Sequence, residues 1–248
     1  PTSMVYGLVS RGYKAGGVNS DPSLHPSDRE FGTEFMWNIE SGLKGNWMQE
    51  ALSAQISVFY QKRKDIQIKQ SLVQSRDDSN ASDFIDYFGN SAKGRNYGLE
   101  IELNWSPTDR LSVFSSVGRL LTDYDTPLSL ALDSREQAHA PSYQYVIGSR
   151  LQLSPNLLWI VEAEGKDKFY LSSSHNERSQ SYRLANTSFI YKTKDWTFSI
   201  WGRNLTDEDV IVRGFGGFGN DPRKYYASEP YYQYGEPRAF GISSDYRF

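Results

Sequence analysis

Apolar and polar side chains alternate along much of this sequence, and the alternation is clearest between residues 97 and 105. The apolar positions of that segment are Tyr97, Leu99, Ile101, Leu103 and Trp105. The positions between them are Gly98, Glu100, Glu102 and Asn104. Successive side chains of a β-strand point to opposite faces, so the segment predicts a strand with one apolar and one polar face.

The same period of two predicts further strands along the chain. They are expected in residues 35–44, 52–61, 143–153, 183–191, 196–203 and 239–248, with the weakest alternation in 183–191. A strand-like segment also lies close to the start of the chain, and less regular stretches lie between the clear ones. In total we expect about ten strands. The predicted fold class is therefore all-β.

The connections between the expected strands are alternately short and long. Short polar turns are expected near residues 45–46, 106–109, 154–156 and 193–195. Long irregular stretches are expected near residues 14–30, 71–82, 124–138, 172–178 and 207–235. Antiparallel strands with short turns at one end and long loops at the other are typical of outer-membrane barrels. The pattern predicts a transmembrane antiparallel β-barrel with periplasmic turns and outer loops.

The composition agrees with a barrel and excludes other classes. Only 38% of residues are hydrophobic, yet 15% are aromatic, as expected for strands that are apolar on one face only. No run of about 18 apolar residues provides a transmembrane helix. The net charge of −3 gives no electrostatic case for nucleic acid, and the absence of Cys excludes disulfides and thiolate metal sites.

The final strand ends on an aromatic residue. One of its faces carries Phe240, Ile242, Ser244, Tyr246 and Phe248, and the other carries small or charged side chains. This end resembles the closing strand of a bacterial outer-membrane barrel, whose terminal Phe belongs to the signal read by the insertion machinery. The resemblance implies that Phe240, Ile242, Tyr246 and Phe248 form a membrane-insertion signal.

Four segments resemble the TonB-dependent receptors of the bacterial outer membrane. They are residues 9–19, residues 90–102 with a Gly-x-Glu-x-Glu pattern, residues 201–208 with Arg-Asn-Leu-x-Asp-Glu, and residues 234–241. Each pattern alone is weak, but the four stand in the order found in the family and span nearly the whole chain.

The resemblance implies a fold. Such receptors are plugged barrels of about 22 strands, so residues 1–248 are expected to be the C-terminal part of the barrel, without the plug domain and the N-terminal strands. No signal peptide precedes Pro1, so for an exported protein we expect processing or truncation at this point.

The resemblance also implies a function, which is TonB-dependent uptake of a scarce ligand, above all a ferric siderophore or another iron complex. The implied partners are outer-membrane lipid, the barrel-insertion machinery, that ligand, and the TonB system, which is contacted through the absent N-terminal region. No cofactor is implied.

Cations and aromatic side chains are interleaved in the last long loop. Such a surface suits an anionic, partly aromatic ligand through stacking and charge pairing. The candidate ligand-binding residues are Arg213, Phe215, Phe218, Arg223, Lys224, Tyr225, Tyr226, Tyr231 and Tyr232, with Tyr13 and Lys14 at another expected outer strand end. Barrel girdles and outer loops are rich in Tyr in any case, so the composition alone does not separate ligand contact from a girdle.

Glu100 and Glu102 share a strand face, and their spacing suits the roughly 5–9 Å between the carboxyls of a glycosidase. The simpler interpretation is that both line a polar lumen, where an adjoining plug supplies their partners. His25, His139 and His175 fall in or beside three different expected loops without metal-ligand spacing, so we expect solvated loop histidines. We therefore predict no catalytic residue, no metal site and no enzyme activity.

Two other functions remain open. One is a small passive porin whose Glu, Arg and Gln residues line a water-filled pore. The other is a lipid-facing enzyme barrel that uses Glu100 or a loop His. A soluble binding protein is a weaker alternative, because its apolar strand faces would need a second layer to cover them.

Overall fold

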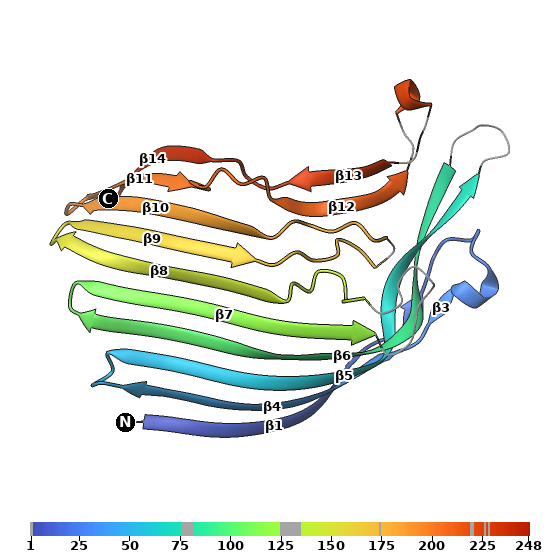
Figure 1. Cartoon of the computed structure of the whole chain (residues 1–248), viewed down its shortest axis with the longest axis horizontal. Helices are drawn as coiled ribbons and strands as arrows, with labels where there is room; N and C mark the ends of the chain where they lie inside the picture. The colour runs from blue at the N-terminus through green and yellow to red at the C-terminus, as the bar shows by residue number, and fades with distance from the viewer. Residues whose placement is uncertain are drawn as a thin grey trace.

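The computed structural model describes residues 2–75, 82–124, 135–173, 175–218, 221–225, 227 and 229–248. Ten antiparallel strands form one curved sheet in which each strand lies beside its neighbour in sequence (Figure 1). In order they are β1 (Thr2–Lys14), β4 (Glu34–Trp47), β5 (Leu52–Ser75), β6 (Ser82–Thr108), β7 (Leu111–Tyr124), β8 (Tyr143–Ser154), β9 (Leu157–Lys166), β10 (Tyr182–Lys192), β11 (Trp196–Arg203) and β14 (Ala239–Tyr246). The prediction of an all-β chain with about ten barrel strands is confirmed. Within the described ranges, no helix has the length and apolarity needed to cross a membrane.

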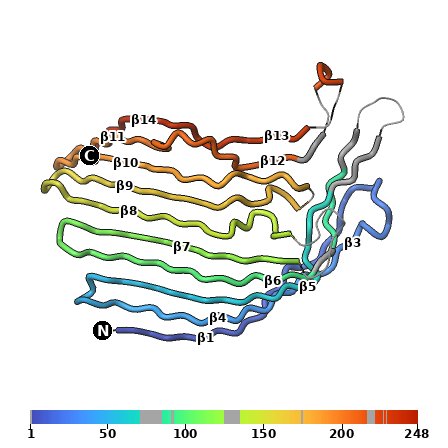
Figure 2. The backbone as a smooth tube through the Cα atoms, in the orientation of Figure 1, coloured from blue at the N-terminus to red at the C-terminus, as the bar shows by residue number. Residues whose placement is uncertain are grey.

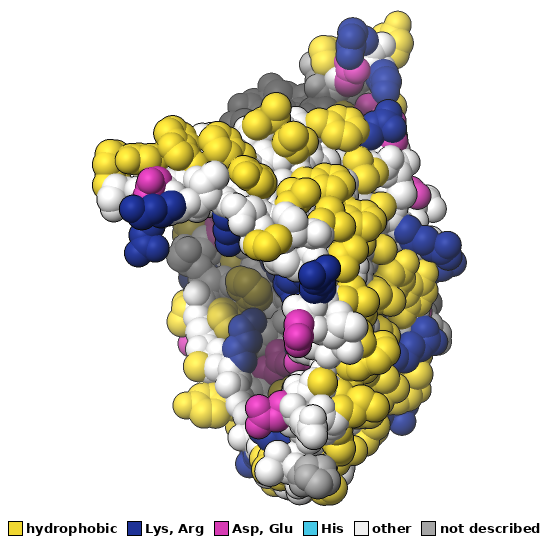
Figure 3. All heavy atoms as spheres, turned by 90° about the vertical axis from the view of Figure 1, so that its left-hand side faces the viewer, with side chains coloured by type: hydrophobic (Ala, Val, Ile, Leu, Met, Phe, Trp, Pro, Cys, Tyr) yellow, Lys and Arg dark blue, Asp and Glu magenta, His cyan; other side chains and the backbone are white. Residues whose placement is uncertain are grey.

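The sheet is a partial barrel wall, one layer thick, with an apolar outer face. Figure 3 shows hydrophobic side chains covering the outer surface, and acidic and basic side chains in the hollow. The register explains this division, since paired residues of neighbouring strands share a face: Tyr60 pairs with Tyr97, and Tyr97 with Leu121. Outer-face residues such as Ile39 and Ile200 are exposed, so the wall does not bury them in a core of its own.

The two ends of the wall differ (Figure 2). At one end the strands are joined by turns at residues 48–51, 109–110, 155–156 and 193–195. The last two turns lie where they were predicted, whereas residues 45–46 belong to β4 and residues 106–108 to β6, so the first two turns come later in the chain than predicted. At the other end lie the long connections, and both chain termini lie at the turn end (Figure 1).

Three predicted irregular stretches contain regular structure, so those predictions were partly wrong. Residues 71–75 and 82 continue β5 and β6. Residues 14–30 include β2 (Gly17–Val18), the 3-10 helix η1 (Pro26–Asp28) and the first residue of β3 (Glu30–Phe31). Residues 207–235 contain β12 (Ile211–Phe218), the 3-10 helix η2 (Pro222–Lys224) and β13 (Glu229–Tyr234). Residues 76–81 and 125–134 lie outside the described residues.

The extension of β5 and β6 has a visible physical cause. A bulge at Asp65, whose φ is 56°, interrupts the register, after which Ile66 and Ile68 pack against Tyr124. Beside them the buried Gln67 side chain donates to the backbone oxygens of Ala15 at 2.8 Å and Gly32 at 2.9 Å. The outer end therefore has a small core of its own, which a search for alternation does not reveal.

Several glycines make room for aromatic rings on the neighbouring strand. Aromatic side chains lie directly opposite a glycine in the register at several places in the wall, among them Tyr6–Gly42, Phe59–Gly98, Phe114–Gly148, Tyr145–Gly165 and Trp201–Gly241. A Cβ on Gly148 would lie 2.3 Å from Phe114 Cζ, and one on Gly241 would lie 2.2 Å from Trp201 Cζ2. Each ring therefore covers the strand position that has no side chain of its own.

Candidate functional site

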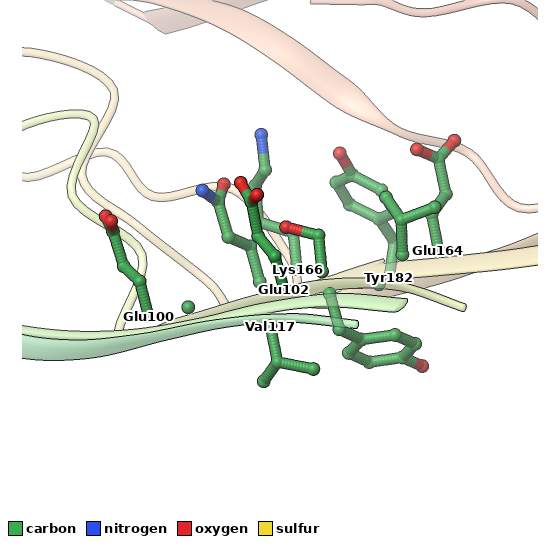
Figure 4. Close-up of a pocket in the computed structure, with 12 residues that line it drawn as sticks. Glu100, Glu102, Val117, Glu164, Lys166 and Tyr182 are labelled. Carbon is green, nitrogen blue, oxygen red and sulfur yellow. The ribbon is translucent and has the colours of Figure 1, made fainter. Parts of the chain in front are cut away.

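A shallow groove crosses the inner face of the wall from β6 to β10. It has a volume of about 360 Å³. Figure 4 shows Glu100, Glu102, Glu164, Lys166 and Tyr182 projecting from one side of the sheet, and Val117 pointing from the other. The register places Glu100, Gly118, Gln144, Lys166 and Tyr182 in one row, and Glu102, Ser116, Val146 and Glu164 in the next.

The groove is acidic. Within the described part of the chain, Glu100, Glu102 and Glu164 have no basic group within 4.0 Å, and Lys166 is the single cation among the residues that line the groove. Glu100 and Glu102 both line this groove on the inner face, where the interpretation of a polar lumen placed them. An open wall of this kind does not place the two carboxylates on opposite sides of a bound sugar, which a glycosidase needs.

The hairpin β12–β13 carries most of the candidate ligand-binding residues. The Arg213 guanidinium lies 4.8 Å from the centroid of the Phe215 ring, and both side chains are exposed. At the tip, Tyr225 is 94% exposed and has a left-handed backbone with φ of 52°. Phe218 lies in β12, but its side chain and all of Tyr226 lie outside the described residues. The hairpin thus displays at least three candidate side chains to the outside.

Two predicted cations of the tip are already paired with acids. Arg223 forms a fork with Asp221, with Nε–Oδ1 at 3.0 Å and Nη2–Oδ2 at 2.9 Å. Lys224 Nζ lies 2.5 Å from Glu229 Oε2, and the Tyr231 hydroxyl donates to Glu229 Oε1 at 3.2 Å. The side-chain hydrogen bond from Arg223 lowers the pKa of Asp221, and that from Lys224 lowers the pKa of Glu229. These ion pairs shape the tip and leave less free charge for a ligand than the sequence suggested.

The hairpin is held against the β9–β10 connection. The Tyr232 hydroxyl donates to Glu177 Oε2, which raises the pKa of Tyr232. Leu171 fills the space beside Gly214, where an added Cβ would lie 2.3 Å from Leu171 Cδ1. Burial lowers the pKa of His175, which also hydrogen-bonds the Gly214 backbone. The hairpin is therefore a packed element and not a free loop.

Arg135 holds the β9–β10 connection in place, and the sequence analysis missed it. It is only 6% exposed, and it donates to the backbone oxygens of His175 at 2.7 Å and Ser172 at 2.5 Å and to Asn176 Oδ1 at 2.7 Å. Its guanidinium also lies 4.3 Å from the Tyr170 ring centroid. No short motif signals such a residue, because its partners are mostly backbone atoms of a distant loop.

Two of the sequence motifs meet at the base of the hairpin. The Asn204 side chain donates to the backbone oxygens of Glu208 at 2.9 Å and Glu236 at 3.2 Å. Beside it, Arg238 Nη2 lies 2.8 Å from Asp207 Oδ2. The segments 201–208 and 234–241 thus fix the point at which the chain leaves β11 and returns to β14.

The structure places Tyr13 and Lys14 far from the hairpin. Both lie at the outer end of β1, at the opposite edge of the ten-stranded sheet (Figure 1). Tyr13 is 75% exposed on the outer face, while Lys14 Nζ lies 5.5 Å from the Phe88 ring centroid. The described chain therefore does not unite them with the hairpin residues in one site.

The four residues of the expected insertion signal are exposed, and three of them, Phe240, Ile242 and Tyr246, share the outer face. Phe240 and Ile242 pair with Gly202 and Ile200, and the Tyr246 ring centroid lies 4.8 Å from that of Trp196. Phe248 follows the strand and contacts Tyr246 edge to face at 5.0 Å.

The three histidines lie in separate environments. His25 caps η1 and hydrogen-bonds Ser27 Oγ at 2.8 Å, and His139 packs against Phe169 at 5.7 Å between ring centroids. Over the described ranges, no group of three or more His, Cys, Asp or Glu side chains is placed to hold a metal ion.

Comparison with known proteins decides the family. The family model for the TonB-dependent receptor-like β-barrel matches residues 1–205. This chain belongs to the TonB-dependent receptor-like β-barrel family.

Solved structures agree on the fold at low sequence identity. The ferric yersiniabactin uptake receptor FyuA from Yersinia pestis superposes with a TM-score of 0.77 and 19% identity, over 99% of this chain and 35% of that chain. The ferric-catecholate import receptor Fiu from E. coli K12 superposes with a TM-score of 0.70 and 17% identity, over 99% of this chain and 33% of that chain. The copper transporter OprC superposes with a TM-score of 0.69 and 14% identity, over 98% of this chain and 37% of that chain. The chain thus spans about a third of the length of these structures.

The match to TonB-dependent receptors confirms several predictions. The wall is a part of a β-barrel of the outer membrane. The family and these solved structures are receptors and transporters, not enzymes.

Proposed function

We propose that this chain is the C-terminal part of the barrel of an outer-membrane receptor that takes up a scarce ligand, namely a ferric siderophore or another iron complex, with energy from TonB. The observation that carries the proposal is the family match over residues 1–205. In this proposal a plug domain and further strands, outside residues 1–248, complete a barrel of about 22 strands.

The acidic groove supports a plug on the inner side of the wall. Glu100, Glu102 and Glu164 are carboxylates in a confined lumen, where unpaired charge is costly once water is displaced. Basic side chains of a plug domain would pair with them. The TonB system would then act through the N-terminal region that accompanies the plug.

The hairpin β12–β13 supports an anionic, partly aromatic ligand. Arg213 beside Phe215 offers a cation and a ring on one exposed surface, and Tyr225 offers a second ring at the tip. The names of the solved structures support an iron chelate, since FyuA is a ferric yersiniabactin receptor and Fiu a ferric-catecholate receptor. OprC, a copper transporter, makes copper the metal to test against iron.

Uptake of radioiron tests the proposal. The complete receptor gene would be restored to a strain that lacks it, and uptake of ferric catecholate and ferric phenolate chelates would be measured with and without TonB. We expect TonB-dependent uptake of one chelate class, and roughly tenfold weaker binding of that chelate by the double variant Arg213→Gln, Tyr225→Ala, which loses cation and ring contacts.

The matched control is Lys194→Gln, which removes a cation from a turn at the opposite end of the wall. This control is expected to transport normally. Uptake of ionic copper but of neither iron chelate would overturn the iron proposal. Uptake that persists without TonB, together with open-channel conductance in planar bilayers, would support the porin alternative.

A further inference from the structure

The outer face of the wall changes its chemistry along β5 and β6. Read toward the outer end, β5 presents Ile56, Val58, Tyr60, Lys62 and Lys64. In the same direction β6 presents Trp105, Leu103, Ile101, Leu99, Tyr97, Arg95 and Lys93. On both strands the apolar band thus ends in a tyrosine, and cations follow it directly on the same face.

The neighbouring strands extend this cationic level. Arg11 of β1 pairs with Trp37 of β4, Trp37 with Lys62, and Lys62 with Arg95. The Arg11 guanidinium lies 4.4 Å from the Phe35 ring centroid and 5.8 Å from that of Trp37. We define the basic belt as Arg11, Lys62, Lys64, Lys93 and Arg95.

The belt has more positive than negative charge. Arg95 Nη2 lies 3.1 Å from Asp123 Oδ2, and Lys64 Nζ lies 3.9 Å from Asp65 Oδ2. Across the residues that the structure describes, no carboxylate lies within 4.0 Å of Arg11, Lys62 or Lys93. All five belt side chains are exposed, and Figure 3 shows Lys and Arg side chains standing out from the apolar outer surface.

We propose that the basic belt binds the phosphate groups of lipopolysaccharide in the outer leaflet. The apolar band below the belt faces acyl chains, and tyrosines mark the interface, so the belt lies at the depth of the headgroups. Guanidinium and ammonium groups there attract anionic lipid, and Arg in particular forms forked hydrogen bonds with phosphate. Trp37 and Phe35 hold the Arg11 guanidinium at this level by stacking.

Lipid binding to the complete receptor in detergent tests the proposal without any transport assay. Bisphosphorylated lipid A would be titrated into the purified receptor, and bound lipid counted by native mass spectrometry. We expect the triple variant Arg11→Gln, Lys62→Gln, Lys93→Gln to bind roughly 100-fold more weakly, and Lys62→Gln alone about fivefold more weakly. The charge-conserving variant Arg11→Lys, Lys62→Arg, Lys93→Arg should bind as the wild type does.

The matched control is Arg110→Gln, Lys192→Gln, Lys194→Gln, which removes the same charge from the turn end. It should leave lipid A binding unchanged, and dephosphorylated lipid A should bind weakly to every form. The proposal is overturned by unchanged binding in the triple and single variants, by an equal loss in the control, or by equal binding of dephosphorylated lipid A. The migration of unheated samples on denaturing gels shows whether each variant is folded.

Discussion

Asn204 shows how much of this structure can depend on a single side chain. It is 3% exposed and has φ of 47°, a backbone conformation that Asn tolerates better than most residues. Its Oδ1 accepts from Glu208 N at 3.0 Å and Thr206 Oγ1 at 3.2 Å, in addition to the two hydrogen bonds that its amide donates. The Asn204 side chain therefore joins the segment that enters the outer hairpin, at Thr206 and Glu208, to the segment that leaves it, at Glu236.

Replacing Asn204 with Ala is expected to loosen this hairpin. The loss of four hydrogen bonds lowers local stability by about 3 kcal/mol, so amide exchange in β12 and β13 should speed up on the order of 100-fold. Hydrogen exchange with mass spectrometry measures this, and the amides of β8 serve as an internal reference. Asn204→Gly keeps the backbone conformation accessible, so a nearly normal exchange rate in that variant would assign the effect to backbone strain instead.

At the scale of elements, the features that depend on neighbouring residues in the sequence could be predicted, whereas contacts between distant segments could not. Alternation located seven of the ten wall strands, and in β6 it assigned Tyr97 and Trp105 to the outer face, because a wall of one layer repeats every two residues. The strands β7 and β9 entered the prediction only through the expected total of about ten. Alternation did not reveal the strands β12 and β13 within residues 207–235, because glycines in β12 and a proline in β13 obscure the period of two. The contacts of Arg135 were beyond reach, because they join loops distant in sequence.

The opposed glycine and aromatic pairs predict which strand positions accept a methyl group. Gly148→Ala would place its Cβ against the Phe114 ring, so we expect a loss of about 1–3 kcal/mol in the unfolding free energy from overpacking. Urea unfolding of the receptor in detergent measures the change.

Gly118→Ala is the matched control on the same face of the wall. The nearest atom to its new Cβ is Gln144 Cγ at 3.6 Å, an ordinary contact, so its stability should be nearly unchanged. Equal effects at both positions would refute the role given to the aromatic ring, whereas relief of the Gly148→Ala defect by Phe114→Leu would support it.

At the scale of the whole molecule, the described sheet has two edges. β1 pairs only with β4, and β14 only with β11. Unpaired edges expose backbone donors and acceptors, which is costly next to lipid and promotes pairing between chains.

Residues 1–248 refolded alone in detergent are therefore expected to form concentration-dependent oligomers. Size-exclusion chromatography with light scattering measures their mass, and hydrogen exchange should show weak protection in β1 and β14. A stable monomer with both strands protected would instead indicate that the chain closes on itself, as the porin alternative requires.

The order of strands along the wall is the order of strands along the sequence. A chain built in this way can gain or lose a hairpin anywhere without rerouting what remains, since every cut falls between neighbours. Duplication or deletion of a hairpin would change the number of strands around the barrel by two and leave the other strands in place. The architecture therefore offers evolution a simple means of changing the circumference of a barrel, one hairpin at a time.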